Sequence, residues 1–435
     1  MSRLPVILIF DIGKTNKKVL LFNEQYKLVY ESDATFTETA DEDGFPCEDV
    51  YILTSWIRVA FNDLLQHPSF EIKAVNFSAY GASFVYLDEA LKVCLPLYNY
   101  LKPYSVVLQK QFYETYGGGS LVSQETASPV LGSLNSGLQL YRIKYESPAA
   151  FDKIKYALHL PQYISFILSR KINADITSIG CHTTLWDFQH NKYHRWVIDE
   201  DLVDKLPGIK NSKEIAGLAN DTIPIGVGLH DSSGALVPYL YSFKEPFVLL
   251  STGTWCISLN PFNHTVLTDH ELKQDCLCYL SIEGKSVKAS RLFAGYEHEQ
   301  QVKQLAERFN VPIDSYKKVT FNAAVLDNDL SDDHYEAAYH QLIASIIAKQ
   351  VISTRLILQG AKVKKIFVDG GFSKNAVYMH LLANAFPEYD VFAASVPQAS
   401  ALGAALSIHA SWNSNDISAD LIGLKHYAPE HKIAD

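Results

Sequence analysis

Short apolar runs that end in a small polar turn recur along the chain and are its clearest pattern. Residues 6–10 are apolar and rich in β-branched side chains, which predicts a strand buried on both faces. Residues 18–22 follow a polar turn as a second strand, so the two runs predict a hairpin. Residues 247–250 and 256–259 repeat this hairpin, and residues 366–368 add another buried strand.

Segments with helical spacing lie between these strands. Apolar residues recur at helical spacing in 55–65 and 343–358, and a further helix is predicted for 161–168. Residues 399–410 are small and apolar, which predicts a close-packed helix around Gly403. Strands that alternate with helices predict an α/β fold.

The repeated hairpin also predicts two halves of the chain. A length of 435 residues suits two large domains. Pro238 and Pro246 flank a short polar stretch ahead of the second hairpin, so we expect the boundary near 238–245. The expected domains are residues 1–240 and 241–435.

Charge and cysteine content limit the partners. Lys and Arg number 38 and Asp and Glu number 48, a formal charge of −10, which disfavours nucleic acid or a membrane as the main partner. Six cysteines in a chain of this length give no disulfide framework. No apolar run reaches the ~18 residues of a membrane helix, so we expect a cytoplasmic protein.

Three strand ends carry the chemistry of phosphate binding. The turns at 11–16, 251–254 and 369–375 combine glycine with Asp, Ser or Thr. Glycine lets the backbone approach an anion, and N–H groups and hydroxyls supply donors. A carboxylate at a strand end can hold hydrated Mg²⁺.

The order of these motifs resembles the FGGY family of carbohydrate kinases, within the superfamily of sugar kinases, heat-shock chaperones and actin. Residues 10–16 resemble its first phosphate motif, 249–255 its second, and 368–375 its adenosine motif. Residues 228–231 resemble the segment with the catalytic aspartate, and 158–178 resembles the linker into it. The resemblance spans nearly the whole chain and implies two actin-like (ribonuclease-H-like) lobes with a cleft between them.

The resemblance implies ATP and Mg²⁺ as cofactors and assigns residues to them. Asp231 is the expected catalytic base that takes the proton of the sugar hydroxyl, and Asp11 and Asp231 are the expected metal residues. The alternative for Asp231 is that it only caps the following helix. The expected nucleotide-binding residues are Lys14, Thr15, Asn16, Thr252, Gly253, Thr254, Gly370, Gly371, Phe372 and Asn375.

Phe372 stands where the family commonly has a third glycine. Its ring either stacks on the adenine or narrows the adenine slot.

The expected sugar pocket follows the rhamnulose and fuculose kinases of the family. The residues assigned to it are Tyr80, Gly81, Ser83, Asn99, His230 and Asp231. Ser83 replaces a frequent charged or amide residue, and Asn99 stands where the family often has the first residue of an Arg-Asp pair. Because polar contacts decide sugar discrimination, these changes leave the identity of the sugar open.

The expected function is ATP-dependent phosphorylation of a hydroxyl on a small ketose or related polyol. The first alternative is a catalytically degenerate sensor of the same fold, and a second is a nicotinamide-dependent oxidoreductase. No Gly-x-Gly-x-x-Gly turn follows a strand and opens a helix, which disfavours the oxidoreductase. A small-molecule sugar is the expected partner, and a homodimer is possible.

Overall fold

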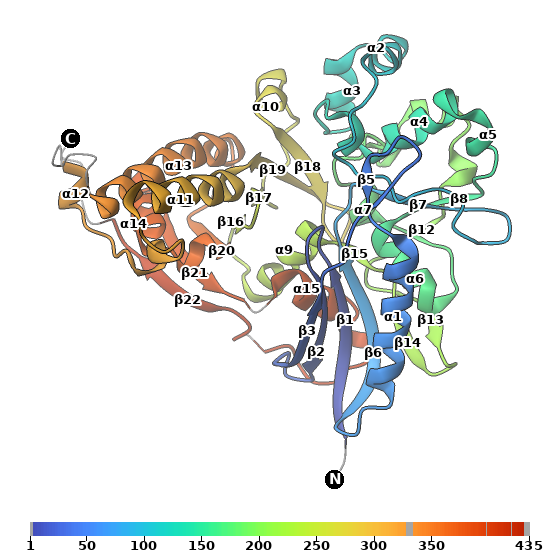
Figure 1. Ribbon diagram of the computed structural model, residues 1–435, viewed down its shortest axis with the longest axis horizontal. Coiled ribbons are helices and arrows are strands. Elements are labelled where there is room, and N and C mark those ends of the chain that lie inside the picture. Colours follow the sequence, from blue (N-terminus) through green and yellow to red (C-terminus); the bar gives the residue numbers. More distant parts are fainter. Residues whose placement is uncertain (1–2, 328–333, 397, 419, 430–435) are drawn as a thin grey trace.

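The chain folds into two lobes, each built on a twisted sheet. The computed structural model describes residues 3–327, 334–396, 398–418 and 420–429. Figure 1 shows the blue and green N-terminal lobe beside the orange and red C-terminal lobe, with strands β17–β19 between them. In the described part of the chain, each main sheet has seven strands.

The sheet of the N-terminal lobe has the order β13-β14-β6-β1-β2-β3, with β15 also paired to β6. Strands β1 and β2 form an antiparallel hairpin, and β1 pairs in parallel with β6. The strands are β1 (Leu4–Ile12), β2 (Lys17–Asn23), β3 (Leu28–Ala34), β6 (Phe70–Ala79), β13 (Ile215–Ala219), β14 (Ile223–Gly226) and β15 (Leu229–His230).

The sheet of the C-terminal lobe repeats this arrangement in the order β18-β19-β17-β16-β20-β21-β22. Strand β16 forms a hairpin with β17 and pairs in parallel with β20, as β1 does with β2 and β6. The strands are β16 (Phe247–Thr252), β17 (Cys256–Asn260), β18 (Cys276–Leu280), β19 (Ser286–Leu292), β20 (Lys365–Gly370), β21 (Asp390–Ser395) and β22 (Gly423–Tyr427). The predicted hairpins and buried strands are therefore present, and they are related by a structural repeat.

Helices cover both faces of β1, which explains why its middle carries no polar side chain. Val6, Leu8 and Phe10 pack into the core beneath α1 (Val50–Leu65) and α6 (Leu160–Ser169). Ile7 and Ile9 point the other way, into a core shared with α9 (Asp231–Ser242) and α15 (Ala399–Ser407). Because successive side chains of a strand point to opposite faces of the sheet, β1 contributes side chains to two cores.

Helices α11 (Ala294–Phe309), α13 (Tyr335–Leu358) and α14 (Ala376–Ala385) cover the C-terminal sheet. Helix α13 is long and apolar enough to cross a membrane, but half of its most apolar window is buried in the lobe. It packs on α11, α14 and β19, which is the environment of a core helix.

The remaining elements are short and lie mostly in a large insertion between β6 and β13. The helices are α2 (Val106–Thr115), α3 (Gly119–Glu125), α4 (Ser136–Glu146), α5 (Pro148–Phe151), α7 (Ile176–Ile179), α8 (Arg195–Asp199), α10 (Asp269–Lys273) and α12 (Ala324–Asp327). The strands are β4 (Thr39–Ala40), β5 (Pro46–Cys47), β7 (Phe84–Leu87), β8 (Tyr156–His159), β9 (Ala174–Asp175), β10 (Trp186–Asp187), β11 (Lys192–Tyr193) and β12 (Ile209–Lys210). The 3₁₀ turns are η1 (Gly132–Leu134), η2 (Val203–Lys205), η3 (Ser315–Lys318), η4 (Phe372–Lys374) and η5 (His409–Ser411).

The two lobes are joined where α9 crosses α15. A Cβ atom on Gly403 would lie 1.9 Å from the carbonyl oxygen of Gly234, so only glycine fits at this crossing. Pro238 lies inside α9 and has no N–H to donate to that carbonyl, which leaves the oxygen open to the close approach of α15. The helix continues through Pro238 to Ser242, so this proline, one of the two that flank the expected boundary, lies inside a helix.

Helix α15 comes late in the chain but packs on the N-terminal sheet. The Asn76 amide on β6 donates to the Ala404 carbonyl at 2.8 Å and lies 3.0 Å from the Ser407 hydroxyl. The helix also contacts β1. The predicted boundary at residue 240 falls within the last turn of α9, and α15 belongs by contact to the lobe that precedes that boundary.

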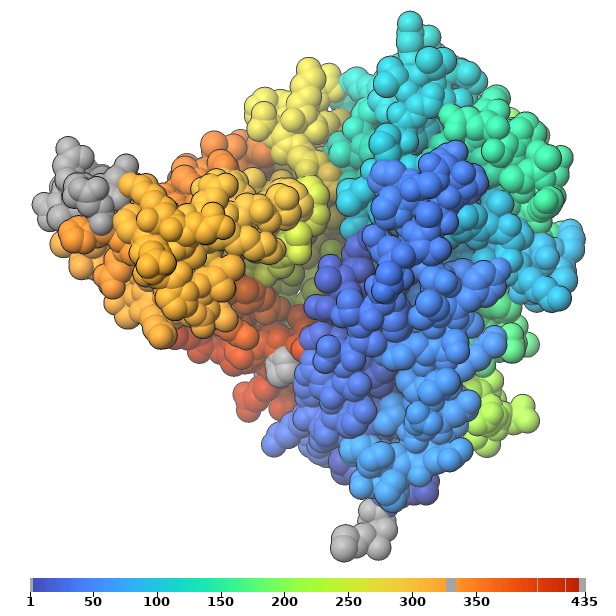
Figure 2. Space-filling view, viewed as in Figure 1, coloured from blue at the N-terminus to red at the C-terminus, as the bar shows by residue number. Residues whose placement is uncertain are grey.

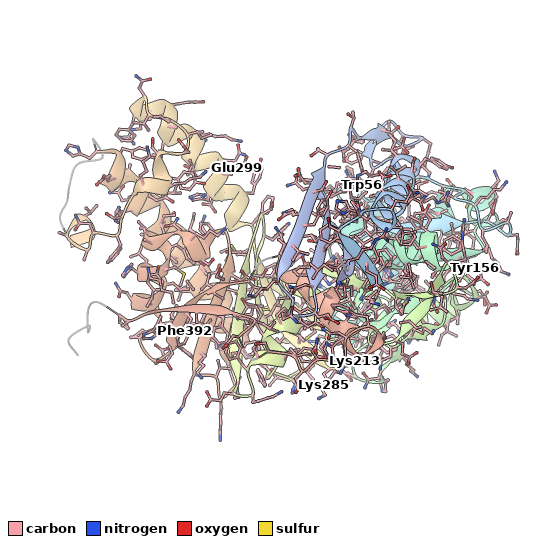
Figure 3. The ribbon with its side chains drawn as sticks, turned by 90° about the horizontal axis from the view of Figure 1, so that it is seen from below. Trp56, Tyr156, Lys213, Lys285, Glu299 and Phe392 are labelled. Carbon is pink, nitrogen blue, oxygen red and sulfur yellow. The ribbon has the colours of Figure 1, made fainter. Side chains whose placement is uncertain are left out.

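A second contact between the lobes runs along β18. The Cys278 amide donates to the Ala127 carbonyl at 3.0 Å. Glu283 forms ion pairs with Lys213 at 2.8 Å and with Lys285 at 3.2 Å. Figure 3 shows Lys213 and Lys285 together at this edge, while Glu299 and Trp56 stand on opposite lobes at the open side.

The glycine crossing gives a direct stability test. We expect Gly403→Ala to force α9 and α15 apart and to lower the free energy of unfolding by about 2–3 kcal/mol, measured by urea denaturation. Gly208→Ala is the control, because a Cβ atom there would meet nothing within 4 Å. A Gly403→Ala protein as stable as the Gly208→Ala control would contradict the close crossing.

Candidate active site

A hollow separates the lobes on the side away from β18. Figure 2 shows it between the blue N-terminal lobe and the orange C-terminal lobe. Strands β1 and β15 end in the N-terminal lobe at the residues singled out from the sequence, and β16 and β20 do so in the C-terminal lobe.

Asp11 lies at the end of β1, opposite Ser78 of β6. Its Oδ2 accepts a hydrogen bond from the Ser400 hydroxyl at 2.9 Å, which brings the start of α15 to the site. Burial, with a smaller contribution from the negative charge of Asp231, raises the pKa of Asp11 to about 6, and the Ser400 hydrogen bond opposes this rise. The two carboxylates therefore share one electrostatic environment.

Asp231 reaches the same place from the other side of β6. Leu229 of β15 pairs with Ser78, the residue that also pairs with Asp11. Two strand spacings of about 4.8 Å put the backbones of β1 and β15 roughly 10 Å apart at this level. Helix α9 begins at once with Asp231, whose side chain is 37% exposed.

The hydrogen bonds of Asp231 leave one carboxylate oxygen open. Oδ1 accepts from the Ser232 amide at 2.6 Å and lies 3.2 Å from His230 Nε2. Among the described residues, none donates a hydrogen bond to Oδ2. The N-cap of α9 is His230, so Asp231 occupies the first turn rather than the cap position of the alternative interpretation.

Buried hydrogen bonds fix the strand that delivers Asp231. The His230 amide donates to the Thr177 hydroxyl at 3.0 Å, and that hydroxyl donates to the Asp175 carboxylate. Asp175 also accepts from the Ser212 hydroxyl. The segment 175–178, which the sequence pointed to as a linker, thus anchors the backbone immediately before Asp231.

The first phosphate turn is tight and open to solvent at its tip. The Gly13 amide donates to the Asn16 carbonyl at 2.9 Å, and Thr15 and Asn16 are exposed. Lys14 forms an ion pair with Glu38 at 2.7 Å. The turn borders a cavity of about 280 Å³ whose lining includes Lys14, Thr15 and Glu38.

A buried ion pair behind this turn was not predicted from the sequence. Lys17 lies 2.8 Å from the Glu48 carboxylate, with both side chains 4% exposed, and donates to the Lys14 carbonyl at 3.0 Å. The Tyr80 hydroxyl donates to the other Glu48 oxygen at 2.9 Å. This network connects the phosphate turn to Tyr80, which directly follows β6, and only the fold brings its members together.

The two turns of the C-terminal lobe are bonded to each other through Thr252. Its hydroxyl donates to the Asp369 carbonyl and accepts from the Phe372 amide at 3.0 Å, while its carbonyl accepts from the Gly371 amide at 2.7 Å. Thr252 is 2% exposed, so it holds the turns in register, and the more exposed Gly253 and Thr254 form the tip.

Glycine is required in the third turn at Gly370. Its φ is +85°, and a Cβ atom there would lie 2.1 Å from the Thr252 carbonyl oxygen. Asn375 caps α14 by accepting from the Tyr378 amide at 3.1 Å and donates to the Tyr339 hydroxyl at 2.7 Å. Both features shape the turn that was predicted to hold adenosine.

Phe372 points into the core of the C-terminal lobe. Its ring is 5% exposed and stacks on Tyr378 with centroids 4.4 Å apart, and the edge of His298 packs on it at 5.2 Å. Stacking of Phe372 on an adenine, one of the two roles considered from the sequence, does not fit this position. The ring instead supports the turn from below.

The predicted sugar residues fall into two groups. Gly81 lies against the His230 ring, with an added Cβ only 2.5 Å from its Cδ2 atom, so these two belong to the wall beside Asp231. Ser83 donates to the Tyr98 carbonyl at 2.9 Å, and Asn99 donates to the Pro46 carbonyl at 3.0 Å.

Ser83 and Asn99 are 1% and 7% exposed. A direct sugar contact by Ser83 or Asn99 stays a prediction, and the burial of both side chains disfavours it. Their internal hydrogen bonds explain why polar residues stand there without facing the hollow.

Several residues near Asp231 were missed from the sequence. Tyr100 lies close enough for the Asp231 charge to contribute to its raised pKa of about 12, after burial as the main cause. Cys181 and Tyr279 are likewise within the electrostatic reach of Asp231. Trp255 follows the second phosphate turn and packs on Phe293 at 4.4 Å. Tyr100, Cys181 and Tyr279 had no sequence signal, whereas Trp255 already belonged to the second phosphate motif identified from the sequence.

The carboxylates fit a hydrated Mg²⁺ better than a cage of protein ligands. No group of three or more potential ligands gathers in the described residues. Mg²⁺ bound with a nucleotide needs only one or two carboxylates, since water and phosphate supply the other ligands. Asp11 and Asp231 repel each other as anions, and a cation beside them would relieve that repulsion.

Profiles of known protein families match the N-terminal and the C-terminal half of the chain separately. A profile of the FGGY family of carbohydrate kinases, N-terminal domain, matches residues 6–235. The C-terminal profile of the same family matches 306–412, and a profile for carbohydrate kinase FGGY, C-terminal domain, matches 244–331.

Curated relatives are distant. A rhamnulokinase from Mannheimia succiniciproducens is 24% identical over 260 residues, which is 57% of this chain and 52% of the relative. The match thus spans about half the length of that relative, and it spans about half of the next rhamnulokinases as well.

Solved structures agree over nearly the full chain. A xylulose kinase from Lactobacillus acidophilus has a TM-score of 0.83 at 16% identity, covering 98% of this chain and 94% of that one. A Plasmodium falciparum glycerol kinase with ADP has a TM-score of 0.77 at 15% identity, covering 99% and 95%. The fold is the predicted α/β fold of two actin-like lobes, and the chain belongs to the FGGY family of carbohydrate kinases.

Proposed function

We propose that this protein transfers the γ-phosphoryl group of ATP to a hydroxyl of a small sugar, with Asp231 as general base. The observation that carries the proposal is the placement of Asp11 and Asp231 on either side of β6, near enough for the charge of Asp231 to raise the pKa of Asp11. Family membership supports the same reaction.

Asp231 is placed to receive the proton of the attacking hydroxyl. Its free Oδ2 accepts a hydrogen bond from the sugar, while Oδ1 stays on the Ser232 amide. Phosphoryl transfer passes through a loose transition state, so the base contributes mainly by orienting the hydroxyl and accepting its proton late. The anchored backbone at His230 keeps that orientation.

Mg²⁺ would neutralise phosphate charge next to Asp11 and Asp231. The residues that meet the triphosphate in this proposal are Lys14, Thr15 and Asn16 of the first turn and Gly253 and Thr254 of the second. Their exposed backbone and hydroxyl groups supply donors for phosphate oxygens.

In this proposal the two lobes bind different ligands. Residues 1–240 hold the sugar and the first phosphate turn, and residues 241–435 hold ATP on the turns at 252–254 and 370–375. The ADP named with the glycerol kinase structure supports a nucleotide in this fold. Closure of the hollow around both ligands would exclude water as a competing acceptor.

The proposed acceptor is a ketose or related polyol. Relatives named rhamnulokinase, xylulose kinase and glycerol kinase support this class. All six cysteines lie in the described part of the chain and are free, which supports a cytoplasmic setting. A homodimer remains part of the proposal, and the sensor alternative has no observation in its favour.

Replacement of the base tests the chemistry. We expect Asp231→Asn to lower kcat by ~100-fold or more with the sugar that the wild type phosphorylates, while Kd for ATP stays within about twofold. The amide oxygen can still accept from the Ser232 N–H, so helix α9 should remain intact by circular dichroism. Asp204→Asn, at an exposed carboxylate, is the control. Full activity in Asp231→Asn would refute the assigned base.

The raised pKa of Asp11 links function to stability. A buried carboxylate with a pKa of about 6 destabilises the fold once ionised, so stability is lost as pH rises from about 4 through 6. Asp11→Asn should therefore raise the free energy of unfolding by on the order of 1–2 kcal/mol at pH 7.5, and this gain should shrink toward pH 4.

Asp11→Asn should also abolish turnover, because Mg²⁺ binding needs the ionised carboxylate. For the same reason, wild-type kcat/KM for MgATP should fall below pH 6. Urea denaturation at both pH values and a coupled ATP assay measure these effects. A variant that is less stable at pH 7.5, or that keeps its activity, would contradict this role of Asp11.

A further inference from the structure

A second group of polar side chains lies buried beside Asp231, between the lobes. It consists of His182, His230, Tyr279 and Arg291, which we call the His182–Arg291 cluster. Their exposed fractions are 7%, 3%, 3% and 7%. The rings of His182, His230 and Tyr279 form a triangle with centroids 6.1, 6.1 and 5.3 Å apart.

The cluster carries polar atoms that no described group satisfies. Both ring nitrogens of His182, Nδ1 of His230 and Nε of Arg291 are buried and have no hydrogen-bond partner in the described part of the chain. An unsatisfied buried polar group costs about 1–3 kcal/mol, so three such atoms on two neighbouring rings, with Arg291 near enough for its charge to lower the pKa of His182, indicate a ligand that supplies the missing bonds.

The two lobes contribute equally to the cluster. His182 follows α7, and its backbone is fixed by a hydrogen bond from the Asn135 amide to its carbonyl at 2.9 Å. Tyr279 and Arg291 stand on β18 and β19 of the C-terminal lobe. A ligand at the cluster would therefore touch both lobes, on the side of Asp231 where His230 and Gly81 form the wall.

The charges favour a neutral oxygen over an anion. Arg291 already has a counterion, since its Nη2 lies 2.7 Å from the Asp275 carboxylate. His182 is neutral, because burial and the nearby Arg291 charge hold its pKa well below the usual range. Asp231 and Asp11 add negative charge on the adjoining side. A neutral imidazole offers one donor and one acceptor, which matches a hydroxyl or carbonyl oxygen.

We infer that His182 and Arg291 form a specificity subsite for a hydroxyl or carbonyl oxygen of the sugar, remote from the hydroxyl that is phosphorylated. The inference deepens the proposed function and rests on it for the identity of the ligand as a sugar. Polar subsites of this kind discriminate strongly, because an analogue without the oxygen leaves buried groups unpaired.

The test measures binding and turnover separately. Rhamnulose, xylulose, glycerol and gluconate are titrated into the full-length wild type by calorimetry, and the same compounds are assayed with ATP. We expect a neutral sugar to bind, and His182→Leu and Arg291→Met each to weaken its Kd by roughly tenfold or more, with Kd for ATP unchanged. His182→Gln retains a donor and an acceptor and should recover part of the affinity.

Arg142→Met is the matched control, because Arg142 is also 7% exposed and lies over an aromatic ring, that of Tyr98, but stands on α4. It should bind the sugar as the wild type does. Unchanged sugar affinity in both His182→Leu and Arg291→Met would overturn the subsite, as would tighter binding of gluconate than of every neutral compound or no binding of any of the four.

Sugar binding that depends on His182 and Arg291 without phosphorylation would support the subsite and refute the kinase proposal. Phosphorylation that is indifferent to both variants would support the kinase proposal and refute the subsite. The two failures are thus distinguishable.

Discussion

Strand β6 imposes the constraint on which the site depends. It pairs in parallel with β1 on one side and with β15 on the other, and both partners meet it at Ser78. Hydrogen bonds of a parallel ladder fix this register, so Asp11 and the start of α9 cannot slide relative to each other. The distance between the two carboxylates is therefore set by the sheet, which is more rigid than a loop.

Holding Asp11 and Asp231 close together lowers the stability of the fold, and other contacts offset this loss. Asp11 and Asp231 are both acidic, and the pKa of Asp11 is raised mainly by burial and additionally by the negative charge of Asp231. The Ser400 hydrogen bond and the tight crossing of Gly403 on Gly234 hold α15 against this pair. Two acidic side chains held this close together lower the stability of the fold, as is common at functional sites.

The sequence was informative where local pattern decides structure. Apolar runs that serve two cores predicted β1 and β16, and the run at 366–368 with its glycine turn predicted the end of β20. It was less informative where contacts join distant segments. Pro238 was taken to flank the domain boundary but lies inside α9, whose Gly234 meets Gly403 of the distant helix α15.

The packing of Phe372 against His298 and the pairing of Lys17 with Glu48 join residues far apart in the chain, which periodicity cannot bring together.

A crystal structure with Mg²⁺, a non-hydrolysable ATP analogue and a bound sugar would test the central claim most directly. The account predicts a sugar hydroxyl about 2.6–3.2 Å from the Asp231 carboxylate, with the γ-phosphate between that hydroxyl and the turn at 11–16. A nucleotide bound outside the hollow, or a sugar out of reach of Asp231, would contradict it.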